Sequence, residues 1–192
     1  MDLHKIGIKF FAGKNSNGEL VEFIPVFHQW IQNKLLDQLL IDVADYSHIN
    51  AGPGIVLVAH EGNYSIDETG NRRGLVYYSK HEVPGKLVER IEEVAVNALK
   101  ACQLLEKDET IKEKITFPGN ELQIFSNDRL HAPNSEETWT AIESSIREFL
   151  DKLFSGQDCL IEREKDPKER FQITVKVPEP VSVDKLLQRI SN

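Results

Sequence analysis

The chain has 192 residues, 40% of them hydrophobic and 28% charged, and its 31 acidic against 23 basic residues give a formal net charge of −8. This size predicts one globular domain, residues 1–192, that buries enough apolar surface to fold without disulfides or metals. The acidic balance excludes a protein whose main task is binding nucleic-acid phosphates, and no segment has the roughly 20 apolar residues that a membrane span needs.

The two cysteines indicate the compartment. Cys102 and Cys159 lie inside apolar patterns and form no CxxC motif, so two buried free thiols are favoured over a disulfide. The N-terminal residues lack the long apolar run and the small-residue cleavage site of a signal peptide. Together these features predict an acidic cytoplasmic protein.

The first elements follow from local patterns. Residues 4–12 alternate apolar residues with Gly7 and Lys9, which predicts a strand. Residues 19–24 are expected to return as a second strand. A helix then begins at Pro25, because proline is favoured in the first turn of a helix.

Residues 39–81 carry the clearest strand signals and also most of the candidate functional side chains. Strand character marks three segments, 40–46, 55–59 and 74–79. Residues 63–67 are expected to extend the second segment past a bend at Gly62. An antiparallel meander is the simplest topology for these strands.

The second part of the chain predicts two long helices, because apolar residues recur every 3.6 residues over 84–106 and 135–155. A strand at 122–125 lies between them. Further elements are expected as a hairpin of 159–163 with 171–177 and a short helix that begins at Ser182. Residues 171–177 alternate apolar and polar side chains, which is typical of a half-exposed antiparallel strand.

These elements predict an α+β fold with a mainly antiparallel sheet and helices packed chiefly on one face. Both parts of the chain run in the order strand, helix, further strands, helix. An alternative interpretation is therefore that residues 1–108 and 115–192 are two pseudo-repeated halves of one sheet, although no residue-level repeat supports it.

Common catalytic and cofactor motifs are absent from the sequence. It contains no GxGxxG after a strand, no GxxxxGK[ST], no HExxH and no GxSxG. These absences exclude the frequent signatures only, so no cofactor is assigned.

The meander suggests one cluster of catalytic residues. If its first turn lies near Asn50, Leu40 faces His60 and Asp42 lies beside Val58, which brings Asp42 and His60 to the same end of the sheet. With Asp45, these side chains provide ligands for zinc, manganese or iron, or an acid–base pair. The alternative interpretation is that all three are solvated or hydrogen-bonded groups without a functional role.

Six further residues are candidates for contact with a ligand. They share polar or aromatic side chains in or just before the meander: His28, Tyr46, His48, Glu61, Asn63 and Tyr64. Structural explanations compete with each, since a helix histidine is often half-buried and strand tyrosines commonly pack across strands.

The sequence therefore predicts a binding protein of unassigned role, with a small molecule or a partner bound at the end of the meander. The alternative is a hydrolase or lyase that uses Asp42, Asp45 and His60, with or without a metal. A homodimer is a further prediction, because residues 171–177 have the pattern of a sheet edge that a second copy can pair with.

Overall fold

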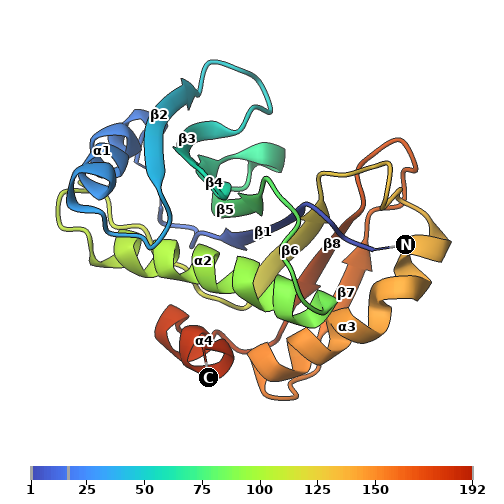
Figure 1. Cartoon of the computed structure of the whole chain (residues 1–192). Coiled ribbons are helices and arrows are strands. Elements are labelled where there is room, and N and C mark those ends of the chain that lie inside the picture. The colour runs from blue at the N-terminus through green and yellow to red at the C-terminus, as the bar shows by residue number, and fades with distance from the viewer. Residues whose placement is uncertain (1, 17, 192) are drawn as a thin grey trace.

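The protein folds around a single eight-stranded antiparallel sheet, seen in a computed structural model that describes residues 2–16 and 18–191 (Figure 1). The strand order is β2-β3-β4-β5-β1-β6-β8-β7. The strands are β1 (Ile6–Phe11), β2 (Leu40–Tyr46), β3 (Gly54–Ala59), β4 (Gly62–Asp67), β5 (Gly74–Ser79), β6 (Glu121–Ser126), β7 (Leu160–Arg163) and β8 (Gln172–Lys176). The α+β class predicted from the sequence is confirmed.

The helices pack against the sheet through apolar stripes. They are α1 (Phe23–Asn33), α2 (Leu87–Lys107), α3 (Glu136–Phe154) and α4 (Val183–Ile190). Figure 1 shows α2, α3 and α4 together on one side of the strands, and the buried residues of all four helices join one core with the sheet. No helix of the described residues is long and apolar enough to cross a membrane.

Two segments differ from the prediction. Residues 19–24 form no strand but a 3₁₀ turn, η1 (Leu20–Glu22), that leads into α1, because Phe23, Val26 and Phe27 bury together only on a helix. Residues 63–67 do not extend β3. The chain reverses at His60–Glu61, and β4 pairs antiparallel with β3.

The register of the meander also needs one correction. Asp42 pairs with Val58, as predicted, but Leu40 pairs with Ala59 rather than with His60. A bulge between Leu40 and Asp42 shifts the pairing by one residue there.

The edges of the sheet are β2 and β7. Residues 171–177 were expected at an edge, but β8 lies between β6 and β7. β2 carries the bulge and two exposed aspartates, Asp42 and Asp45, and β7 spans only four residues. Bulges, charges and shortness are features that protect sheet edges from pairing. The homodimer and the half-repeats stay predictions.

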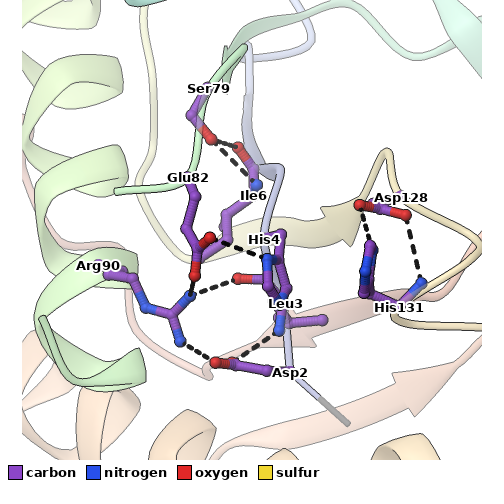
Figure 2. Close-up of polar contacts among 9 residues, drawn as sticks. All are labelled: Asp2, Leu3, His4, Ile6, Ser79, Glu82, Arg90, Asp128 and His131. Atoms are coloured by element: carbon purple, nitrogen blue, oxygen red, sulfur yellow. Dashed lines mark hydrogen bonds and ion pairs between the residues drawn. The ribbon is translucent and has the colours of Figure 1, made fainter. Parts of the chain in front are cut away.

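A buried arginine anchors the segment that leads into β1, as Figure 2 shows. Arg90 of α2 is 3% exposed, and its Nη1 donates to the carbonyl oxygen of Leu3 at 2.9 Å. Its Nη2 donates to the Asp2 carboxylate. At the end of the neighbouring strand β5, Ser79 Oγ accepts a hydrogen bond of 3.1 Å from the backbone N–H of Ile6. These bonds fix the start of β1 against α2 and β5.

We expect Arg90→Met to lower the free energy of unfolding by about 2 kcal/mol, because it removes two charge-assisted hydrogen bonds and leaves the Leu3 carbonyl without its partner. Urea unfolding followed by circular dichroism measures the change. Arg147→Met is the control. Its exposed pair with Glu143 on α3 is expected to contribute under ~0.5 kcal/mol. Equal losses in both variants would contradict the anchoring role.

Candidate functional site

The sheet face opposite the helices, here called the open face, carries an unusual mixture of side chains. Among the described residues no α-helix packs on it, and the buried hydrophobic residues outside the main core all lie there: Phe11, Val56, Val76 and Phe125. Strand register aligns one residue from each strand in a row across this face: Ala44, Val56, Ser65, Val76, Lys9, Gln123, Thr174 and Glu162.

Lys9 occupies the middle of that row and is only 3% exposed. Its ammonium donates to the Asp67 carboxylate at the end of β4 and to the carbonyl oxygen of Arg72 at 2.7 Å. Gly74 makes room for the lysine side chain, because a Cβ at that position would lie 2.7 Å from Lys9 Cε. The sequence therefore buries a charge on the face of β1 that alternates with its apolar residues.

Burial lowers the pKa of the Lys9 ammonium from its ordinary value of 10.5, and the Asp67 carboxylate opposes that shift. A buried charge is tolerated only where a partner compensates for lost hydration. The ion pair with Asp67 is therefore a condition for Lys9 to stay charged on this face.

A second cation lies nearby on the chain segment that enters β8. The Arg170 guanidinium stacks on the Phe125 ring, 3.6 Å from its centroid. It donates to Asn127 Oδ1 at 3.1 Å and to Gln172 Oε1 at 3.3 Å. The Phe125 ring in turn lies over Gly7, where a Cβ would come within 2.2 Å of ring atoms.

These groups surround a cavity of about 310 Å³ on the open face. Strands β1, β4, β5, β6 and β8 all contribute to its lining, which includes Lys9, Ser65, Asp67, Tyr78, Gln123, Phe125, Asn127, Arg170 and Gln172. A neighbouring cavity of about 520 Å³ shares Pro53, Asp67, Thr69, Arg170 and Gln172 with it and extends to Glu164 and Glu169. We call the two together the open-face pocket.

The structure places the three predicted catalytic residues on exposed surface. Asp42 and Asp45 are three residues apart on β2, so their side chains point to opposite faces of the sheet. Asp45 accepts from the backbone N–H and Oγ of Ser47, and the His60 ring lies 3.5 Å from the Glu61 carboxylate. No hydrogen bond or ion pair joins Asp42, Asp45 and His60 in the part of the chain that the structure describes.

The six predicted ligand contacts are dispersed. His28, Tyr46, His48 and Glu61 are exposed, and Tyr64 is fully buried in the main core against Tyr77, with ring centroids 4.7 Å apart. Asn63 lies closest to the open-face pocket, since its Nδ2 donates to the hydroxyl of Tyr78 at 2.7 Å. Within residues 2–16 and 18–191, no three His, Cys, Asp or Glu side chains are placed to hold a metal ion.

A separate histidine pair lies beside the Arg90 anchor (Figure 2). The rings of His4 and His131 stack with centroids 4.6 Å apart. Each Nδ1 faces a carboxylate, Glu82 at 3.1 Å and Asp128 at 2.8 Å, and the hydrogen bond from His131 lowers the pKa of Asp128. Neither histidine lines the open-face pocket. Glu82, which faces His4, also lies 3.9 Å from Arg90 Nη1 and so connects the pair to the anchor.

No protein-family model matches this chain, and no curated protein matches its sequence. The geometry of the open-face pocket is therefore the evidence from which a function can be argued.

The sequence interpretation missed this pocket because its charged groups lie far apart in the chain. Lys9, Asp67 and Arg170 meet only through the strand order. Two signals were present. Gly7 lies inside β1 and Gly74 opens β5, and glycine within a strand often marks a close approach of another group.

We expect Asp67→Asn to lower the free energy of unfolding at pH 7 by roughly 3 kcal/mol, because it leaves the Lys9 cation buried without its counter-charge. Urea titrations measure the loss. A Lys9→Met, Asp67→Asn double variant should recover much of it, since no buried charge then remains. The exposed pair of Lys100 with Asp37 supplies the control Asp37→Asn, for which no resolvable change is expected.

The pH dependence of stability tests the same pair. Because the pKa of Lys9 is lower in the folded protein, the unfolded chain binds more protons between that pKa and 10.5, and stability rises with pH across this window. Asp67→Asn removes the carboxylate that opposes the shift, so the window should extend to lower pH in this variant. A variant whose stability does not begin to rise at a lower pH than that of the native protein would contradict a charged, buried Lys9.

Proposed function

We propose that the protein binds a small polar molecule in the open-face pocket. The observation that carries this proposal is the lining: a buried ion pair and a stacked arginine surround a cavity on the one sheet face that no described helix covers. Pockets for small molecules are concave, combine aromatic and aliphatic walls with a few fixed polar groups, and commonly measure about 300–1,000 Å³.

The polar groups of the pocket are held in place before any ligand arrives. Phe125 and the amide oxygens of Asn127 and Gln172 orient Arg170, and Asp67 orients Lys9. Such preorganisation reduces the entropy that binding costs, because fewer side chains must be immobilised on association. This supports recognition of a ligand over a purely structural role for these charges.

The proposal places the site beside the meander rather than at the residues predicted from sequence, because β4 and β5 contribute Ser65, Asp67 and Tyr78. A hydrolase or lyase at Asp42, Asp45 and His60 stays a prediction that no contact among them favours. We also propose that the protein acts in the cytoplasm, where its two free thiols, Cys102 and Cys159, stay reduced.

We expect Gln123→Trp to abolish ligand binding, because an indole at this position occupies the cavity floor between Lys9 and Phe125. The measurement is thermal unfolding in the presence of a panel of small metabolites. A ligand at 100 times its Kd stabilises the folded state by about 2.7 kcal/mol. At least one compound should raise the melting temperature of the native protein but not that of Gln123→Trp.

The matched control is Ala44→Trp. Thr174 would be unsuitable for this purpose, because its hydroxyl accepts from Gln123 Nε2 at 3.2 Å; Ala44→Trp, in the same row on the edge strand β2 but outside the lining of the pocket, should respond to the same compound as the native protein. Compounds that stabilise Gln123→Trp as strongly as the native protein would contradict binding at this site, as would a panel with no stabilising compound.

A further inference from the structure

Arg170 differs from the other arginines that line a hollow on this protein. Arg72 and Arg73 border a cavity near Phe11, and each already holds a carboxylate of the chain. Arg72 forms two hydrogen bonds of 2.6 Å with Glu121, and Arg73 contacts Glu68 at 2.6 Å. Among the described residues, no carboxylate forms an ion pair with Arg170. Its partners are the neutral amide oxygens of Asn127 and Gln172.

The smaller cavity of the open-face pocket has a net positive charge, the same sign as Arg170. Its lining contains two cations, Lys9 and Arg170, and one carboxylate, Asp67, although the whole chain has a net charge of −8. The Asp67 carboxylate already accepts from Lys9 and from the Thr69 hydroxyl. Arg170 is therefore the cation of the smaller cavity that no carboxylate contacts directly, although Asp67 and Glu169 act on it electrostatically and Glu164 and Glu169 line the neighbouring cavity.

The arrangement of Arg170 suits one class of partner. A guanidinium is planar and offers five N–H donors, and its edges match carboxylate and phosphate oxygens. Stacking on Phe125 fixes the plane, and the two amide oxygens use one donor on each terminal nitrogen. Burial lowers the pKa of Arg170, as expected for a cation that loses hydration without gaining a full counter-charge.

We propose that the ligand of the open-face pocket is an anion, a small molecule whose carboxylate or phosphate group binds the Arg170 guanidinium. This inference rests on the proposed function, since it assigns the chemical class of the molecule bound there. The Lys9 ammonium borders the same cavity, and its charge is balanced by Asp67.

The test uses phosphate, malonate and succinate as probes, with malonamide as an uncharged analogue of malonate. Isothermal titration at constant ionic strength measures the affinity of each probe, because exposed charges are screened by salt. We expect at least one anion to bind the native protein and malonamide not to bind. Binding of phosphate indicates a ligand with a phosphate group, and binding of malonate or succinate indicates a ligand with a carboxylate group.

Arg170→Gln should weaken the affinity for the anion by at least about tenfold, because hydrogen bonds to a charged group are lost. Arg170→Lys keeps the charge but loses the planar edge, and it should give an intermediate loss. Arg147→Gln is the matched control. Arg147 is exposed on α3, lies outside the pocket and changes the net charge equally, so this variant should bind like the native protein. Circular dichroism confirms that each variant is folded.

Equal affinity of Arg170→Gln and Arg147→Gln for the anion would overturn the inference, as would binding of malonamide as tightly as malonate, or no binding of any anion. The proposed function fails separately. If a neutral metabolite binds the native protein and is excluded by Gln123→Trp but unaffected by Arg170→Gln, the pocket binds ligands and only the assignment of an anion is wrong.

Discussion

The ion pair between Lys9 and Asp67 is the constraint on which the open face of this sheet depends. A lysine at the centre of β1 has no room to reach solvent past its neighbours, so its charge must be compensated within the fold. That requirement fixes several other features. Gly74 leaves space for the lysine side chain, β4 must end at Asp67, and the start of β1 must be held in place. Arg90 meets the last requirement from the opposite side of the sheet by binding the backbone at Leu3.

The lining of the pocket draws on both parts of the chain. Lys9 and Asp67 come from the first part of the chain, whereas Phe125 and Arg170 come from the second. They meet because β1 and β6 pair at the centre of the sheet. On the outer sides of this pair, β5 lies next to β1 and β8 lies next to β6. Neither part alone contains a complete lining. Even if the halves share an origin, the site belongs to their junction.

The sequence was sufficient to predict those helices and strands that depend on local periodicity. The apolar rhythm of α2 and α3 and the alternation in β8 were sufficient to assign these elements and the α+β class. The short segment of η1 lacked such a rhythm. At His60–Glu61 the glycine that follows, Gly62, indicated only a bend, because neither turn residue is a glycine, proline or asparagine. The site was beyond reach for another reason. Its residues are adjacent only through register, and one bulge at Leu40 was enough to displace the predicted partner of that residue.

The two faces of the sheet differ in a way that stability alone does not explain. The face toward the helices is filled by aliphatic and aromatic side chains. The open face buries four hydrophobic residues beside Lys9 and Asp67 and orients Arg170, although well-packed apolar residues usually stabilise a protein as well as or better than a buried ion pair. The polar groups on this face therefore need a reason beyond stability. A guanidinium held flat by a phenyl ring and paired only with neutral amides supplies one, since it has the shape and charge to receive an anionic group from outside the chain.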